Sequence, residues 1–82
     1  MRHYVAVVHK IARSGYGVWF PDLPGCTSRG RTVDAAMKAA REALDGHLTG
    51  LRDAGKPVPR PRDFHAVIMS TDSKGAIAFI LI

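Results

Sequence analysis

The sequence has a single cysteine, Cys26, and no apolar run long enough to cross a membrane. One thiol cannot form an internal disulfide, and this cysteine usage fits a reducing compartment. The longest apolar run, residues 76–82, has the length of a strand, whereas a membrane-spanning helix needs about 20 apolar residues. Met1 and Arg2 lead directly into a patterned strand, without the features of a secretory signal. We therefore expect a cytoplasmic protein with no membrane contact.

Residues that carry catalysis or bind metals are also sparse. The histidines, His3, His9, His47 and His65, have no metal-ligand spacing such as His-x-x-x-His, and no second cysteine is present. The carboxylates fall mainly on the polar side of one expected helix, so we expect no cluster that could hold two metal ions. A glycine-rich phosphate loop and a nucleophile elbow are both missing. We therefore expect no enzyme activity, no cofactor and no metal site.

Acidic residues are few relative to basic ones. Seven Asp and Glu against twelve Lys and Arg give a formal net charge of +5. This charge permits binding to nucleic acid or to an acidic protein surface. The residues that would make such contacts are Arg29, Arg31, Arg60 and Arg62. A basic nucleic-acid-binding domain is therefore one hypothesis, and a solvated surface is the alternative.

Alternating apolar residues predict three strands, at residues 3–11, 16–20 and 26–31. The first is apolar on both faces, which suits the interior of a sheet. The second places Trp19 on the face opposite its other large apolar side chains, because strand neighbours alternate. The third is polar, which suits a sheet edge. With a turn at 12–15, these strands predict an antiparallel meander.

Apolar residues that recur every three or four positions predict one long helix after the strands. Thr32 suits the N-cap, and Gly55 followed by Pro57 suits the end of the helix. Gly46 and Gly50 lie inside this helix, where each costs about 1 kcal/mol relative to alanine. We attribute them to a close approach of the helix to the sheet. A contact site for a partner helix is the alternative, which makes both glycines candidate oligomer-interface residues.

The chain after the helix predicts a proline-rich connector, a short helix near 63–69 and a last strand at 76–82. A short strand at 66–69 is the alternative to the short helix. A right-handed crossover through the long helix predicts that the last strand runs parallel to the first, in a sheet of order 3-2-1-4.

The fold class is therefore α+β, a small β-β-β-α-β domain with one long helix on one face of the sheet. In this sheet the last strand is an apolar edge, and such an edge invites pairing with another chain. Phe79 and Leu81 of that strand are therefore candidate oligomer-interface residues.

The most distinctive stretch is the corner Phe20-Pro-Asp-Leu-Pro-Gly-Cys26. Its two prolines fix φ and its glycine can adopt a positive φ, so the corner holds one loop shape between two strands. Together with the preceding aromatic strand and the Ala-rich helix that opens at Thr32, this run resembles the HicB-like antitoxins of bacterial toxin–antitoxin pairs. The resemblance extends from Tyr4 to Ile82.

The resemblance implies the partly RNase-H-like N-terminal domain of these antitoxins. It also implies a non-catalytic module that binds and occludes a HicA-type toxin, a small basic ribonuclease that cleaves mRNA. The candidate toxin contacts are then Asp22, Leu23, Trp19 and Arg29. Family members usually continue into a C-terminal domain that binds operator DNA and autoregulates transcription. That domain has no counterpart before Ile82, so we expect residues 1–82 to be a single N-terminal domain.

A function of another class stays open beside toxin binding. The chain would then be a homo-oligomerising structural module of a DNA-binding antitoxin or repressor, associating through the last strand or the glycine-bearing helix. Both this chain and HicA-type toxins are basic, which disfavours electrostatic steering between them. Docking on such a toxin would therefore depend on apolar contacts and local carboxylates.

Overall fold

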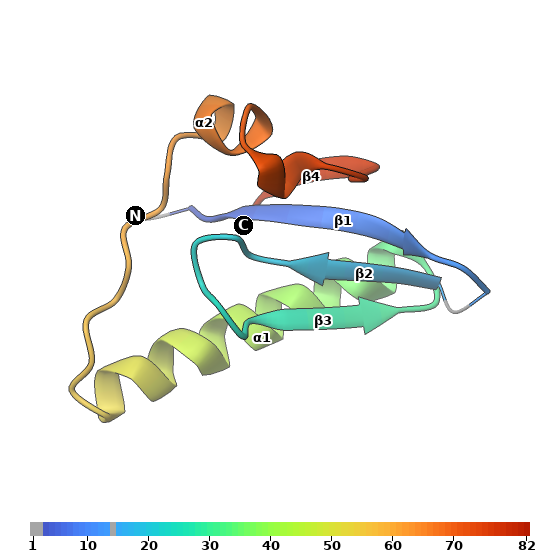
Figure 1. Ribbon diagram of the computed structural model, residues 1–82. Coiled ribbons are helices and arrows are strands. Elements are labelled where there is room, and N and C mark those ends of the chain that lie inside the picture. The colour runs from blue at the N-terminus through green and yellow to red at the C-terminus, as the bar shows by residue number, and fades with distance from the viewer. Residues whose placement is uncertain (1–2, 14) are drawn as a thin grey trace.

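The computed structural model describes residues 3–13 and 15–82, and it confirms the α+β fold class (Figure 1). Its elements are β1 (Val5–Ile11), β2 (Gly15–Trp19), β3 (Thr27–Gly30), α1 (Val33–Asp53), α2 (Phe64–Ile68), the 3-10 helix η1 (Thr71–Ser73) and β4 (Ala78–Leu81). The predicted long helix and short helix are both present. The turn predicted at 12–15 includes Ser14, which lies outside the described residues, as do Met1 and Arg2.

The strands form one sheet in the predicted order, β3-β2-β1-β4. All three strand pairs are antiparallel. The interior strand β1 is buried from Val5 to Val8, whereas the edge strand β3 alternates between exposed and half-buried residues. Just beyond the paired strands, Tyr4 and Ile82 exchange two backbone hydrogen bonds of 2.8 and 2.9 Å.

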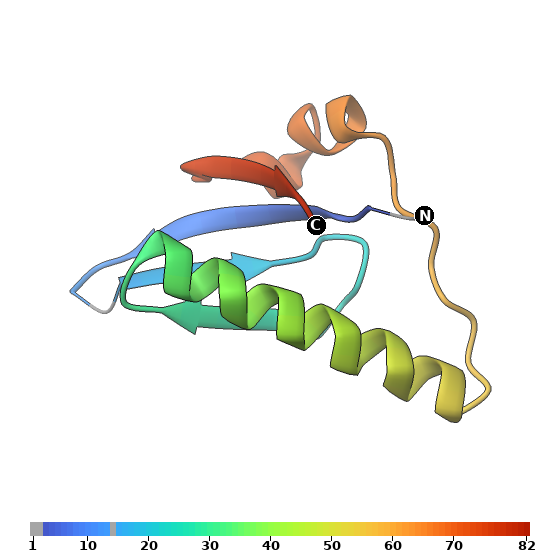
Figure 2. The ribbon, with the colours of Figure 1, turned by 180° about the vertical axis from the view of Figure 1, so that it is seen from behind.

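The prediction that the last strand runs parallel to the first is wrong. β4 is antiparallel to β1, with Val5 opposite Leu81 and Val8 opposite Ala78. The reason lies in the chain between α1 and β4, which does not lead from the helix directly into the strand. It crosses to the other face of the sheet, where α2 and η1 carry it back along β1 before β4 begins (Figures 1 and 2). This second helical segment reverses the direction that a simple crossover would give.

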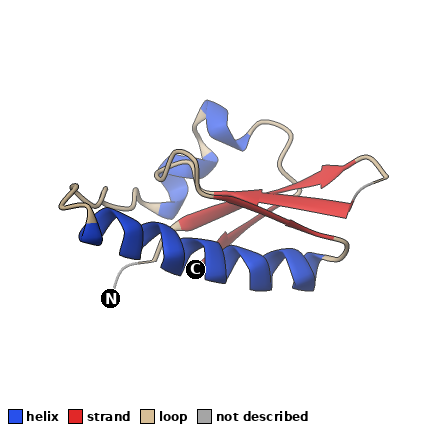
Figure 3. Ribbon diagram, turned by 90° about the horizontal axis from the view of Figure 1, so that it is seen from below, coloured by secondary structure: helices blue, strands red, loops and turns tan. Residues whose placement is uncertain are grey.

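Alternation along β1 builds an apolar cluster on each face of the sheet. On the face covered by α1 (Figure 3), the fully buried members include Tyr4, Ala6, Val8, Phe20, Ala36 and Ala40. On the opposite face, Val5 and Val7 pack against Val67 of α2, with Trp19, Phe64 and Phe79 half-buried around them. The connector is tied to the first cluster, because the Tyr4 hydroxyl donates to the carbonyl oxygen of Pro59 at 2.5 Å.

The start of α1 lies very close to Gly30 of β3. A Cβ at this position would lie 2.4 Å from the backbone nitrogen of Ala36, so only glycine fits there. Gly46 and Gly50 instead face open space, because within residues 3–13 and 15–82 no group beyond their own stretch of helix lies within 4 Å of an added Cβ. The predicted reason for these two glycines, a close approach of the helix to the sheet, is therefore wrong. The second half of α1 extends past the end of the sheet (Figure 2).

Candidate functional site

The corner at 20–26 is held in place by Asp22. Its carboxylate accepts the backbone N–H of Arg62 at 2.8 Å and the Nε–H of the same residue at 2.5 Å. Arg62 also donates from Nη2 to Asp72 at 3.0 Å. Hydrogen bonds raise the pKa of the Arg62 guanidinium, and the bond to Asp22 contributes more to this rise than the bond to Asp72. The Asp22 side chain is only 9% exposed, so this predicted contact residue is engaged within the chain.

The inner side of the corner belongs to the core. Leu23 is 1% exposed, its N–H donates to the Phe20 carbonyl, and its own carbonyl accepts the N–H of Cys26, both at 3.0 Å. Burial raises the pKa of the Cys26 thiol, so the thiol is protonated at neutral pH. Gly25 completes the loop at a φ of 87°. Leu23, also predicted as a contact residue, therefore lies inside the molecule.

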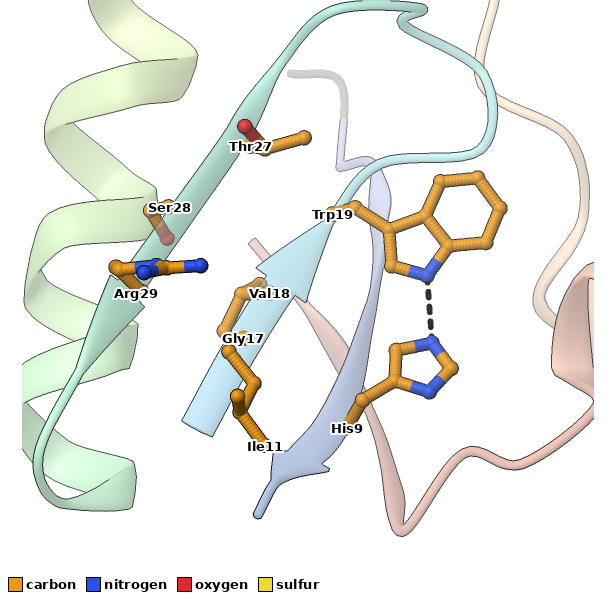
Figure 4. A pocket seen from close by; sticks show the side chains of 8 residues that line it. All are labelled: His9, Ile11, Gly17, Val18, Trp19, Thr27, Ser28 and Arg29. Atoms are coloured by element: carbon orange, nitrogen blue, oxygen red, sulfur yellow. Dashed lines mark hydrogen bonds between the residues drawn. The ribbon is translucent and has the colours of Figure 1, made fainter. Parts of the chain in front are cut away.

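Trp19 and Arg29 lie on the sheet face opposite α1, where a hollow opens over β2 and β3 (Figure 4). The pairing of β1, β2 and β3 places Trp19 opposite Thr27, and Gly17 opposite both His9 and Arg29. The hollow has a volume of about 540 Å³, and the residues lining it are His9, Ile11, Gly17, Val18, Trp19, Thr27, Ser28 and Arg29. The structure thus brings together two of the four predicted contact residues on one surface.

One wall of the hollow is a hydrogen-bonded aromatic pair. The indole Nε1–H of Trp19 donates to Nε2 of His9 at 2.7 Å, with the ring centroids 6.2 Å apart (Figure 4). Because Nε2 must offer a lone pair, the neutral imidazole carries its proton on Nδ1. Each ring fixes the other, so the half-buried indole is held in one orientation.

The floor of the hollow is Gly17. A Cβ at this position would lie 3.0 Å from Cδ1 of Ile11, so a side chain at position 17 would crowd Ile11 and occupy part of the hollow. Sequence analysis missed both Gly17 and His9. The alternation that puts Trp19 on this face also puts Gly17 there. The meeting of His9 with Trp19 depends on strand register, which in a hairpin is set by the type and length of the turn.

Arg29 is the charged residue that lines the hollow, and it is exposed. Both ion pairs of the described chain involve Arg62, so Arg29 has no carboxylate partner there. Within residues 3–13 and 15–82, no group of three or more His, Cys, Asp or Glu side chains could hold a metal ion. The same part of the chain has no helix that is long and apolar enough to span a membrane.

The candidate interface residues lie on two other surfaces. Gly46 and Gly50 are exposed on α1. On β4, Phe79 is half-buried and packs edge-on against Phe64, with centroids 6.3 Å apart, whereas Leu81 is 53% exposed. The candidates therefore differ in exposure: both glycines and Leu81 are accessible to a partner, whereas Phe79 packs mainly inside the molecule.

The chain belongs to the HicB-like antitoxin family of bacterial toxin–antitoxin systems. The family model matches residues 4–82, which confirms the resemblance carried by the corner and the helix.

Two solved structures and one phage protein are similar to this chain. Antitoxin HicB of Burkholderia pseudomallei is 35% identical, with a TM-score of 0.86 that covers 100% of this chain and 62% of that chain. A chain of the HicA3–HicB3 toxin–antitoxin complex is 32% identical, with a TM-score of 0.77 and coverages of 98% and 92%. An uncharacterized 14.9 kDa protein from the rep-hol intergenic region of Haemophilus phage HP1 is 31% identical over 78 residues, 95% of this chain and 58% of the phage protein. This chain thus spans less than two thirds of the Burkholderia antitoxin and of the phage relative.

Proposed function

We propose that this chain is the toxin-binding domain of an antitoxin, which acts without catalysis by covering a HicA-type ribonuclease. The observation that carries the proposal is the similarity of 98% of the chain to a chain of the HicA3–HicB3 complex. Membership of the HicB-like antitoxin family supports it. In this proposal residues 1–82 act as a single N-terminal domain in the cytoplasm, and operator binding belongs to a separate C-terminal domain.

The surface that best suits toxin contact is the sheet face around Trp19 and Arg29. Tryptophan and arginine are enriched among the residues that dominate protein interfaces, especially where they sit beside a pocket. The bond to His9 fixes the indole before binding, which lowers the entropy lost on association. Asp22 and Leu23 act indirectly, because they hold the corner that leads out of β2.

The test is co-purification of the chain with the small basic protein encoded beside it, followed by an RNA-cleavage assay. We expect a stoichiometric complex in which cleavage stops. Trp19→Ala should weaken the complex by about 30-fold, since a central aromatic residue contributes roughly 2 kcal/mol or more. Lys38→Ala, on the exposed side of α1, is the control and should bind as the original chain does. Failure to form a complex would reject the proposal, and equal affinities of the two variants would reject this surface.

A second candidate function is self-association through β4. The strand lies at the sheet edge, the run 76–82 carries no charge and no proline, and Ile77 and Leu81 are 54% and 53% exposed. An edge without such protective residues can pair with the same edge of a second copy about a two-fold axis. The exposed Gly46 and Gly50 of α1 offer a second surface for the same purpose.

Leu81→Lys tests the edge. We expect the chain to form a dimer or larger oligomer, measured by light scattering after size exclusion, and the variant to be monomeric because a lysine blocks edge pairing. Met69→Lys is the control, since Met69 is 72% exposed but lies at the end of α2 rather than on the edge strand. An original chain that is already monomeric, or a variant that keeps its oligomeric state, would contradict pairing through β4.

A further inference from the structure

We infer that the hollow formed by His9, Gly17, Trp19 and Arg29 binds one nucleotide of a single-stranded nucleic acid. The base would lie against the Trp19 ring beside Ile11, and the phosphate would meet Arg29. The inference goes beyond toxin binding, although both involve Trp19 and Arg29.

The shape of the hollow suits a flat ring. Its volume of about 540 Å³ lies within the range of small-molecule sites. Gly17 itself adds no side chain, and the side chains of Ile11, which lies next to Gly17, and of Trp19 supply apolar surfaces. Since the Trp19 Nε1–H is already bonded to His9, the indole offers a ligand its ring face rather than its donor. Stacking on a fixed aromatic ring is how many sheet surfaces bind unpaired bases.

The charge of the hollow suits a phosphate. Arg29 lines it, no carboxylate does, and the described part of the chain gives Arg29 no ion-pair partner. A guanidinium matches the oxygens of a phosphate in a two-pronged hydrogen bond. The net charge of +5 adds a general attraction to nucleic acid. The base of a nucleotide thus matches the Trp19 ring, and its phosphate matches Arg29.

We assign a single strand because stacking on the Trp19 ring needs a base whose face is exposed. In a duplex the bases are stacked and paired, and exposing one of them costs free energy. An acidic peptide would match Arg29 but would leave the Trp19 ring without a stacking partner. These two alternatives, duplex and acidic peptide, give different results in the test.

Trp19 is the single tryptophan of the sequence, so intrinsic fluorescence reports directly on the hollow. The full chain is titrated at low salt with an oligouridylate octamer and, separately, with an oligothymidylate octamer. We expect saturable quenching by at least one of them, and the stronger of the two identifies RNA or DNA as the source. A duplex of the same length should bind at least about tenfold more weakly, because its bases cannot stack on Trp19.

Gly17→Val is the decisive variant. The added side chain occupies part of the hollow and requires only the Ile11 side chain to shift, since its Cβ would lie 3.0 Å from Cδ1 and 3.5 Å from Cγ1 of Ile11. Valine suits a strand, so we expect the sheet to be retained. We expect the variant to bind the octamer about tenfold more weakly, the loss of one stacked base. Circular dichroism confirms the fold of each variant.

Two arginine variants separate the hollow from general electrostatic attraction. Arg29→Gln should weaken binding and lower the slope of log affinity against log salt by about one. Arg41→Gln, on the exposed side of α1 and outside the hollow, should bind within about twofold of the original chain at the same salt concentration. The inference is overturned if neither octamer quenches Trp19, if Gly17→Val binds unchanged, if the duplex or an oligoglutamate peptide quenches equally, or if both arginine variants lose the same affinity. None of these measurements uses a toxin, so they stand apart from the test of toxin binding.

Discussion

Asp22 joins two parts of the chain that are 40 residues apart. The corner sequence predicts a rigid loop, and the resemblance to HicB-like antitoxins makes the Asp22 carboxylate a candidate toxin contact. Its real partner, Arg62, comes from the connector, whose path depends on the position of α2 across the sheet. Sequence analysis could not place that path, so it missed the contact between Asp22 and Arg62.

Removing this carboxylate should destabilise the fold. Asp22→Ala deletes the acceptor of two hydrogen bonds from Arg62, one of them charged, and we expect the free energy of unfolding to fall by about 1–2 kcal/mol. Urea denaturation measures the change. Asp45→Ala, at an exposed position of α1, is the control and should change stability by no more than about 0.5 kcal/mol. A fall of similar size in both variants would mean that the Asp22–Arg62 contact contributes little.

Among the elements, the helix α1 is predicted best from the sequence. The reason for its two interior glycines is predicted worst. The 3.6-residue periodicity fixes which side of the helix is apolar, and Thr32 caps it as expected through a bond to the N–H of Ala35. Periodicity does not show where the sheet beneath a helix ends. The second half of α1 passes that end, so Gly46 and Gly50 meet nothing, whereas Gly30 of β3 makes the close approach.

Alanine at Gly46 or Gly50 should therefore change the free energy of unfolding in the opposite direction from alanine at Gly30. Gly46→Ala and Gly50→Ala should each raise the free energy of unfolding by about 0.5–1 kcal/mol, because alanine costs less entropy in a helix and the space is open. Gly30→Ala should lower it, because the new Cβ would press on the backbone of Ala35 and Ala36. Urea denaturation of dilute protein tests all three. Destabilisation by the Gly46 or Gly50 variant would show that the open space is filled by another part of the chain or by a second copy.

For the whole molecule, strand order could be predicted and strand direction could not. Order follows from the antiparallel meander of the first three strands, which puts the polar third strand at an edge, and from the connection that returns the last strand beside the first. The direction of β4 depends on the whole connection after α1, including the five residues of α2, whose docking through Val67 is a tertiary contact. The hollow escaped prediction for the same reason, since it needs three strands in register.

Net charge gives a prediction at this scale that separates the two proposed ligands. A HicA-type toxin is basic, like this chain, so salt screens their repulsion and should leave the affinity of the complex unchanged or raise it. Binding to a single-stranded octamer should instead fall steeply as salt rises, because counterions are released on binding. Titrations at two salt concentrations, one low and one physiological, measure both slopes. A toxin complex that weakens with salt as steeply as the octamer would contradict binding through apolar contacts.

The paired backbones of Tyr4 and Ile82 have a topological consequence. β1 and β4 have the geometry of a hairpin whose two arms are joined by hydrogen bonds but not by a loop, so the path of the backbone is an almost closed ring. A peptide bridge of a few residues would close that ring without disturbing either strand. The same chain could then be opened in the connector before Pro59, away from the contacts of Pro59 and Arg62, which would bring the corner and the edge strand into a new order along the sequence.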